Sequence, residues 1–461
     1  MHRKDRGFSS LDVLALSFGT MIGWGWIMLS GQWAEKAGML GAGFAFVIGA
    51  VMCIFVGLIY SELTPMLPFS GGAVVFAGVS MGYWPAVFTG LATSFAYIGI
   101  AAWEGPAIVK ALFYIIDIPK GPALWTFAGE TVYLTHIFIS FFFALLIALV
   151  NIFGPRATAI FQKVATSCII LVGVLFIIGS VFFGRTENIG PAFTDYKGFS
   201  SVLLMVPAMF VGFDIIPQTA GDMNVPSKKI PSLLVLSIIA AAAWYILMIA
   251  ATCFSAPTDV RQNGTIPVAD AMAYVFANPI GGKICILGAV CGILSSWNGF
   301  LLGAAEVLAV MAQADMLPKY IGRLHPKFGT PWIATMFCAF FCCLACLLGT
   351  GALTWLVNAS SFGVVLMYLM ATLSFIFLRI RKPQMRRPYR IKHAVLIAAA
   401  GIMSSVFFAW QYLPFGPSPL QKTEWLLVII WFMAWLVPAL FCRFTGNHSK
   451  ELSISILTKE L

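Results

Sequence analysis

Seven consecutive residues near the N-terminus could bind a small ligand through their backbone. They interrupt an apolar segment that runs from about Leu11 to Trp33, and they read Gly19, Thr20, Met21, Ile22, Gly23, Trp24 and Gly25. Each glycine weakens a helix by about 1 kcal/mol relative to alanine. Within a membrane, a loosened backbone is tolerated only where protein or a water-filled cavity surrounds it. A glycine-interrupted apolar segment therefore indicates a binding site of the kind found in transporters.

The interrupted helix would present two kinds of backbone group to a ligand. Unpaired N–H groups at the start of its second half, at the positive end of a half-helix dipole, could bind a carboxylate. Carbonyl groups at the end of its first half could bind an ammonium group or another cation. Together these groups suit a zwitterion, of which amino acids are the smallest abundant examples. The alternative is that the glycines only allow helices to pack closely.

A second interrupted segment carries an acid. The residues between Pro207 and Pro217 include the run Phe210, Val211, Gly212, Phe213 and Asp214. Two prolines and a glycine prevent an uninterrupted helix here. An ionisable residue inside a membrane segment is a functional candidate. Asp214 could meet an ammonium group, hold a cation or carry a proton, or it could cap the local backbone.

Further polar groups fall inside or at the ends of apolar segments. Glu104 could face the cavity and select a positively charged substrate, or it could lie in water near the outer mouth. Adjacent hydroxyls at Ser295 and Ser296 could complete an all-oxygen sodium site, although serines in membrane helices more often bond to their own backbone. Coupling to sodium or to protons is the only cofactor requirement that we expect. Glu62 is expected to have a structural role.

The composition requires membrane helices to position these residues. The chain has 461 residues, of which 60% are hydrophobic and 10% charged, and its mean hydropathy is +0.92. Soluble domains carry roughly 25% charged residues. Apolar runs of about 20 residues predict an all-α membrane protein with about twelve transmembrane helices, centred near residues 22, 52, 97, 141, 170, 211, 243, 298, 341, 366, 403 and 434.

The two interruptions fall in the first and sixth predicted spans, as in a transporter with an inverted five-helix repeat and broken helices 1 and 6. We therefore expect a single membrane transport domain over residues 1–461. Its predicted parts are a cytoplasmic N-terminus (1–9), a first repeat (10–183), a second repeat (199–378), two extra helices (394–443) and a cytoplasmic C-terminal tail (444–461).

The charge distribution predicts the orientation in the membrane. The formal net charge is +10, and a cytoplasmic N-terminus places 20 of the 28 Lys and Arg residues on the cytoplasmic side. This asymmetry follows the positive-inside rule, so both termini are predicted to be cytoplasmic. The basic run from Arg379 to Lys392 is interpreted as an orientation signal that could contact anionic lipid. A nucleic-acid partner is not expected.

The sequence gives no indication of an enzyme, a metal site or a disulfide framework. The five histidines are scattered, and neither an HExxH nor a GxxxxGK[ST] motif is present. All ten cysteines lie within predicted spans or at their ends, where they fit as small apolar residues.

Several segments, taken in order, resemble the amino acid–polyamine–organocation (APC) superfamily of transporters. The run from Gly19 to Ile27 resembles the G-S/T-x-I-G-S/T-G-I-F signature of its first helix. The other matching segments are Tyr60–Leu63 with Pro68–Gly72, Phe210–Asp214 with Val225–Pro231, and Leu317–Tyr320 with His325–Pro331. The resemblance implies an inverted-repeat amino acid permease that works by alternating access.

The resemblance also implies roles for individual residues. The substrate carboxylate would meet backbone amides from Met21 to Gly25, and Phe210 would cap the substrate. The amino group would meet carbonyls of Gly19, Thr20, Phe210, Val211 and Gly212. One departure is Trp24, which stands where the family usually has Ser or Thr and could shrink the pocket, exclude a carboxylate or stack on a cation. Another is Ile169, which stands where some proton-coupled relatives carry a lysine, so lysine-based coupling is not expected.

The predicted function is secondary active transport of amino acids across the cytoplasmic membrane. The alternatives are an amine or polyamine carrier of the same fold, favoured by Trp24, Glu104 and Asp214, and an amino acid sensor that does not transport. Membrane lipid and a small-molecule amino acid or amine are the expected partners. The particular substrate, the coupling ion, the direction of transport and the oligomeric state stay open at the level of sequence.

Overall fold

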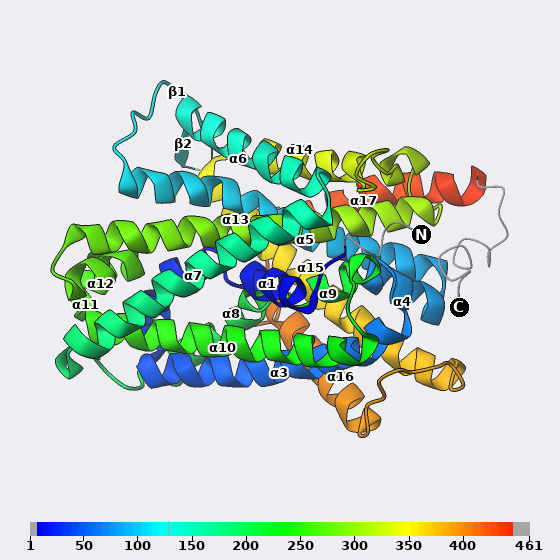
Figure 1. Ribbon diagram of the computed structural model, residues 1–461, viewed down its shortest axis with the longest axis horizontal. Helices are drawn as coiled ribbons and strands as arrows, with labels where there is room; N and C mark the ends of the chain where they lie inside the picture. Colours follow the sequence, from blue (N-terminus) through cyan, green and yellow to red (C-terminus); the bar gives the residue numbers. More distant parts are fainter. Residues whose placement is uncertain (1–6, 128, 446–461) are drawn as a thin grey trace.

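The computed structural model describes residues 7–127 and 129–445, and its regular structure is almost entirely helical (Figure 1). The longest helices run side by side along the long axis of the molecule. Nine of the described helices are long and apolar enough to cross a membrane. They are α3 (Met39–Met66), α5 (Tyr83–Ile115), α6 (Leu134–Ile152), α7 (Pro155–Phe183), α10 (Ile230–Ser255), α13 (Pro279–Gln313), α15 (Gly349–Arg381), α16 (Ala394–Tyr412) and α17 (Lys422–Thr445).

Two further helices are long and apolar enough to cross a membrane only when taken together, and they meet at an angle of 50°. These are α1 (Ser10–Met21) and α2 (Gly25–Ala37). The remaining described helices are α4 (Gly72–Met81), α8 (Tyr196–Met209), α9 (Ile215–Gln218), α11 (Thr258–Asn263), α12 (Pro267–Val275) and α14 (Trp332–Cys346). Short 3₁₀ turns are η2 (Thr186–Asn188), η3 (Ala220–Asp222), η4 (Ser227–Lys229) and η5 (Lys319–Gly322).

The predicted all-α membrane fold is confirmed. Each predicted span centre falls within one helix or within an interrupted pair, although α14 and the α8–α9 pair are shorter than a full span. The count of twelve spans and the five-plus-five repeat stay predictions. The loop after α5 contributes strand β1 (Ala123–Phe127), which pairs antiparallel with β2 (Glu130–Tyr133).

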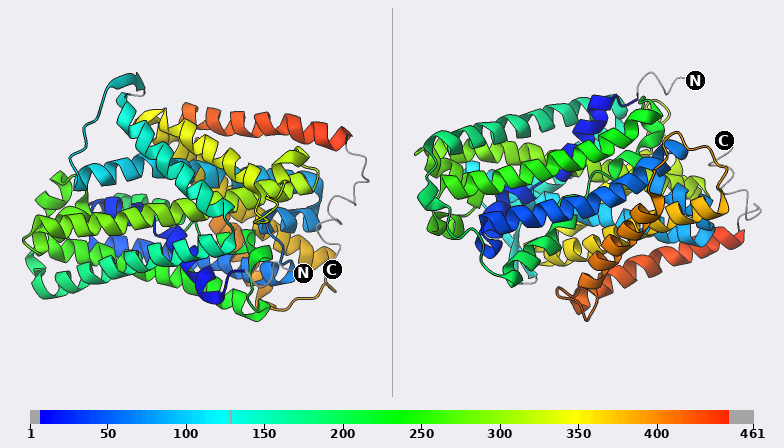
Figure 2. Two further views of the ribbon diagram at one scale, coloured as in Figure 1. Left: turned by 45° about the horizontal axis from the view of Figure 1, so that its top comes forward. Right: turned by 90° about the horizontal axis from the view of Figure 1, so that it is seen from below.

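Glycines allow the central helices to approach the interrupted ones. The apolar windows of α5, α13 and α15 are among the most buried of the described spans, whereas α17 lies at the edge of the bundle (Figure 2). On α13, a Cβ atom at Gly299 would lie 1.8 Å from Oγ1 of Thr20, and one at Gly303 would lie 2.6 Å from Cδ1 of Ile215. The same face of α13 therefore touches both interrupted segments.

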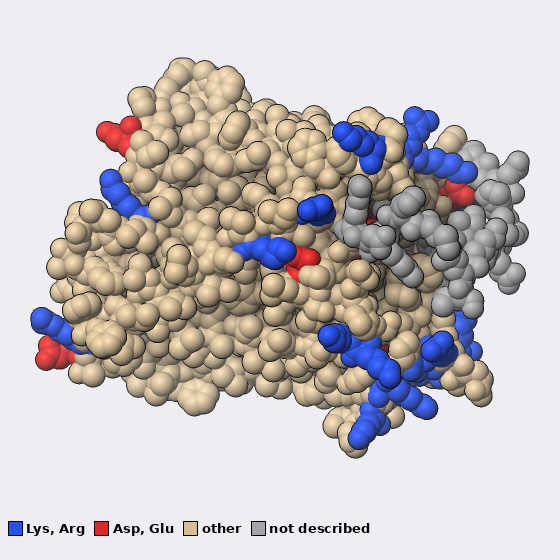
Figure 3. All heavy atoms as spheres, viewed as in Figure 1, with Lys and Arg blue, Asp and Glu red and all other residues tan. Residues whose placement is uncertain are grey.

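Basic side chains gather at the end of the molecule where the termini lie (Figures 1 and 3). Some of these basic side chains form ion pairs within the protein. The Glu62 carboxylate is 1% exposed and accepts hydrogen bonds from Nε of Arg379 (3.0 Å), Nε of Arg387 (3.1 Å) and N–H of Ile391 (2.8 Å). These contacts agree with the structural role expected for Glu62. The basic run that was interpreted as an orientation signal also ties the loop after α15 to α3.

Candidate functional site

The first interruption separates α1 from α2 by three residues. α1 ends at Met21 and α2 begins at Gly25, so the local backbone leaves the helical path where the glycines are concentrated. A Cβ atom at Gly23 would lie 2.8 Å from Oγ of Ser296 and 3.3 Å from Oε1 of Glu104. Glycine is therefore needed at this position because α5 and α13 bring polar side chains against the backbone.

The second interruption contacts the first directly. The segment 210–214 separates α8 from α9, and Gly212 has φ +137°, a conformation that other residues rarely adopt. A Cβ atom at Gly212 would lie 2.7 Å from the backbone nitrogen of Met21. The structure thus brings together the two interruptions that the sequence predicts.

A cavity of about 660 Å³ adjoins both interruptions. Its size falls within the range of roughly 300–1,000 Å³ that is usual for small-molecule sites. The predicted site residues that line it are Thr20, Met21, Gly23, Trp24, Gly25, Val211, Glu104 and Ser296.

The start of α2 offers unpaired backbone donors to this cavity. The first four N–H groups of a helix have no partner within the helix. Trp24 is the N-cap residue, and no side chain caps the helix there. Since the N-terminus of a helix also carries a partial positive charge, this end of α2 can bind an anionic group.

Glu104 supplies the negative charge of the site. Its side chain is 3% exposed and lines the cavity. The hydroxyl of Ser296 donates a hydrogen bond to Oε1, while Oε2 has no hydrogen-bond partner among the residues that the structure describes. Of the two positions that the sequence left open for Glu104, the structure shows the one that faces the cavity.

Asp214 lies beside the cavity rather than on it. It is fully buried, and its Oδ1 accepts a hydrogen bond of 2.8 Å from N–H of Gly212, while the hydroxyl of Tyr97 donates to Oδ2. These contacts match the alternative in which the carboxylate caps the local backbone. They hold the second interruption in shape.

Four other residues that were predicted to bind substrate are not among those that line the cavity, namely Gly19, Ile22, Phe210 and Gly212. The ring of Phe210 is fully buried and packs on Phe46 and Tyr245, with centroids 6.2 and 6.3 Å away. Gly19 faces α7 and α13, since a Cβ atom there would overlap Oγ of Ser295 and Nε2 of Gln162.

A chain of buried amides occupies the region where the sequence suggested a sodium site. Nε2 of Gln162 donates to Oγ of Ser295 (2.6 Å) and to the carbonyl of Ala15 (3.3 Å). Nδ2 of Asn298 donates in turn to Oε1 of Gln162 (2.8 Å). Both predicted hydroxyls thus make hydrogen bonds to protein groups, Ser295 as acceptor from Gln162 and Ser296 as donor to Glu104.

Several cavity residues were missed at the level of sequence. Apolar and sulfur-containing side chains come from several helices, namely Met28, Trp103, Met205, Met209 and Phe300. Four polar side chains come from α15, α16 and α17, namely Asn358, Ser361, Gln411 and Glu424. The only local signal for the second group is the presence of polar residues near the ends of apolar spans.

Residues 8–439 match the amino acid permease family. The chain belongs to this family, because the match covers nearly its full length. It is similar to a branched-chain amino acid permease of Bacillus subtilis, at 24% identity over 96% of this chain and 94% of the relative. It is also similar to a glutamate/serine transporter of Bacillus subtilis, at 27% identity over 90% of this chain and 79% of the relative.

A plant relative is named for a different class of substrate. Cationic amino acid transporter 7 of Arabidopsis thaliana is 24% identical over 88% of this chain and 71% of the relative. The predicted membership of the APC superfamily and the predicted class of membrane transport protein are confirmed.

Proposed function

We propose that the protein is a secondary active transporter that moves amino acids or related amines across the cytoplasmic membrane by alternating access. Its membership of the amino acid permease family supports the class, and the relatives named above support amino acids as substrates. The observation that carries the proposal is Glu104, a buried carboxylate that lines the cavity between the two interruptions and whose Oε2 has no hydrogen-bond partner among the described residues.

The cavity offers a group for each charge of an amino acid. The unpaired N–H groups at the start of α2 would bind the carboxylate. Oε2 of Glu104 would accept a hydrogen bond from the ammonium group. Both groups adjoin Gly23, so one amino acid head group could meet both of them.

A carrier for amines without a carboxylate is the second candidate. It is favoured by Trp24, whose bulky side chain lines the cavity at the start of α2. An amino acid and its decarboxylated amine, such as leucine and isoamylamine, separate the two candidates. Stronger binding of the amino acid supports the first, and equal or stronger binding of the amine supports the second.

For coupling, we propose protons rather than sodium. Ser295 and Ser296 are occupied by hydrogen bonds from Gln162 and to Glu104. A buried charge is costly unless it is paired, and among the described residues Glu104 has no ion-pair partner. The ammonium group of the substrate and a proton would alternately neutralise the Glu104 carboxylate. Substrate and proton would therefore cross the membrane in opposite directions.

The experiment is a ligand screen on the purified full-length protein. A ligand that binds the folded state raises its apparent thermal stability, so a panel of amino acids and amines identifies the substrate class. The variant Glu104→Gln should weaken binding of the selected ligand by about tenfold to a hundredfold, because a hydrogen bond to a charged group contributes about 1.5–3 kcal/mol. Glu187→Gln, at an exposed position in η2, is the control that should bind normally. Unchanged affinity in Glu104→Gln would contradict the assignment.

A further inference from the structure

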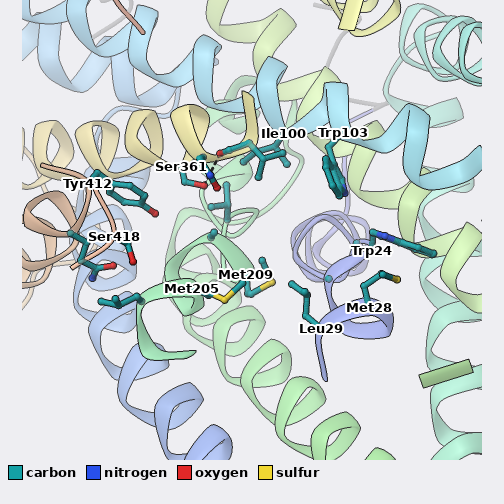
Figure 4. A pocket seen from close by; sticks show the side chains of 18 of the residues that line it. Trp24, Met28, Leu29, Ile100, Trp103, Met205, Met209, Ser361, Tyr412 and Ser418 are labelled. Carbon is teal, nitrogen blue, oxygen red and sulfur yellow. Dashed lines mark hydrogen bonds between the residues drawn. The ribbon is translucent and has the colours of Figure 1, made fainter. Parts of the chain in front are cut away.

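The cavity extends from the two interruptions toward a second group of helices. Figure 4 shows Trp24 and Trp103 on one side, Tyr412 on the opposite side, and Met205 and Met209 between them. The far side is built by α15, α16, the loop at 413–421 and the start of α17. Two of these helices lie outside the predicted repeats.

The cavity is larger than a single amino acid requires. Its volume is about 660 Å³. Since a water molecule occupies about 30 Å³ in the liquid, the cavity has room for roughly twenty non-hydrogen atoms, about twice the number in an amino acid such as leucine. A ligand bound at Glu104 could therefore extend to the far side.

Glu424 at the far side already has its charge compensated by protein groups. It is 2% exposed, and its Oε1 accepts a hydrogen bond of 2.8 Å from Nδ2 of Asn358. Its Oε2 accepts one of 2.7 Å from N–H of Gln421, at the positive end of α17. A protein donor already engages each oxygen and the positive end of α17 offsets part of the charge, so a cationic ligand group gains less here than beside an unpaired carboxylate. Each oxygen keeps a further lone pair that can accept from a ligand donor.

Gln411 lacks a partner that its chemistry requires. It lies in the last turn of α16, is 1% exposed and lines the cavity, and its Nε2 has no hydrogen-bond partner among the described residues. Buried amide groups in proteins are almost always hydrogen-bonded. A carboxamide can also turn to present either its donor or its acceptor. The unpaired Nε2 of Gln411 therefore indicates a ligand group that accepts a hydrogen bond, while Glu424 beside it can take a ligand donor.

We propose that Asn358, Ser361, Gln411 and Glu424 form a second subsite for the far end of an elongated substrate. The group that it takes is uncharged and both donates and accepts hydrogen bonds, as a carboxamide or a urea does. The apolar chain of the substrate passes the flexible thioethers of Met205 and Met209. This inference rests on the proposed function, which places the amino group of the substrate at Glu104.

The test compares three amino acids on the full-length protein, two of the same side-chain length and one that is shorter and lacks a polar end. L-Citrulline ends in a urea, L-arginine has the same shape but ends in a guanidinium, and L-norleucine ends in a methyl group. We expect citrulline to bind about tenfold more tightly than arginine or norleucine. In Gln411→Met, citrulline and norleucine should bind with nearly the same affinity, while the affinity for norleucine stays the same as in the unmodified protein. Ser405→Ala is the matched control, since Ser405 is also buried on α16 but is not a lining residue.

Specific outcomes would overturn the subsite. They are tighter binding of arginine than of citrulline, equal binding of citrulline and norleucine, a citrulline advantage that survives Gln411→Met, and two citrulline molecules per protein at saturation in equilibrium dialysis. If Gln411→Met does not fold, the order of the three ligands in the unmodified protein decides. Normal binding of norleucine by Glu104→Gln would instead contradict the proposed function, so the two failures are distinguishable.

Discussion

Two buried carboxylates lie beside the interruptions, and their hydrogen bonds separate their roles. Both oxygens of Asp214 are bound by protein donors, whereas Oε2 of Glu104 is unpaired within the described structure. Only Glu104 lines the cavity. At the scale of single residues, ligand recognition is therefore expected to depend on Glu104 and the shape of the second interruption on Asp214.

Replacing Asp214 should reduce stability more than binding. Asp214→Asn removes the charge from the bonds with Gly212 and Tyr97, and we expect it to lower the free energy of unfolding by about 1–3 kcal/mol. The affinity of the selected ligand should stay nearly unchanged. Thermal unfolding and ligand titration of the same sample measure both quantities. A loss of affinity as large as that in Glu104→Gln would show that Asp214 contacts the ligand.

The contact between the interruptions belongs to the scale of elements. Gly212→Ala forces a side chain into a positive-φ conformation and against the backbone of Met21, 2.7 Å away. We expect it to destabilise the protein by roughly 1–3 kcal/mol and to reduce binding. The matched control is Gly82→Ala, which shares a positive φ (+100°) but meets nothing within 4 Å. If both variants have the same effect, the two interruptions do not depend on close contact.

A second contact between elements is the ion-pair cluster that joins Glu62, near the end of α3, to Arg379 and Arg387. Glu62→Gln leaves Arg379 and Arg387 without their shared carboxylate, and removing one partner of a buried pair costs about 3–5 kcal/mol. Lys319 pairs with Asp315 over 3.2 Å but is 75% exposed, so Asp315→Asn should cost at most about 1 kcal/mol. Unfolding experiments on the two variants compare these values. Equal losses of stability would show that the Glu62 cluster is not a structural tie.

Local patterns predicted the elements better than the site. Glycine and proline act on their own backbone, so both interruptions could be placed from sequence. The rotation of α5 that turns Glu104 toward the cavity depends on packing against α13, which no local pattern encodes. For the same reason the sequence could not separate the role of Glu104 from that of Asp214, or show that Gln411 and Glu424 reach the same cavity. The glycine-rich run from Gly19 to Gly25 located the site, whereas the charge of the site became visible only from the tertiary contacts.

At the scale of the whole molecule, the account predicts how transport depends on ions. Because protons and substrate ammonium would compete for Glu104, net uptake into proteoliposomes should be faster when the interior is more acidic than the exterior, and low external pH should slow it. Replacing sodium with choline should leave the rate unchanged, since Gln162 and Glu104 engage Ser295 and Ser296. Uptake that requires external sodium, or that is driven by an acidic exterior, would contradict this coupling.

The central claim is that the ligand bound at Glu104 crosses the membrane. The most direct measurement is accumulation of the radiolabelled ligand from the stability screen in sodium-free proteoliposomes with an acidic interior. We expect the unmodified protein to accumulate the ligand above its external concentration and Glu104→Gln to show no more than protein-free liposomes. Tight binding without accumulation or exchange would contradict the claim and indicate a sensor.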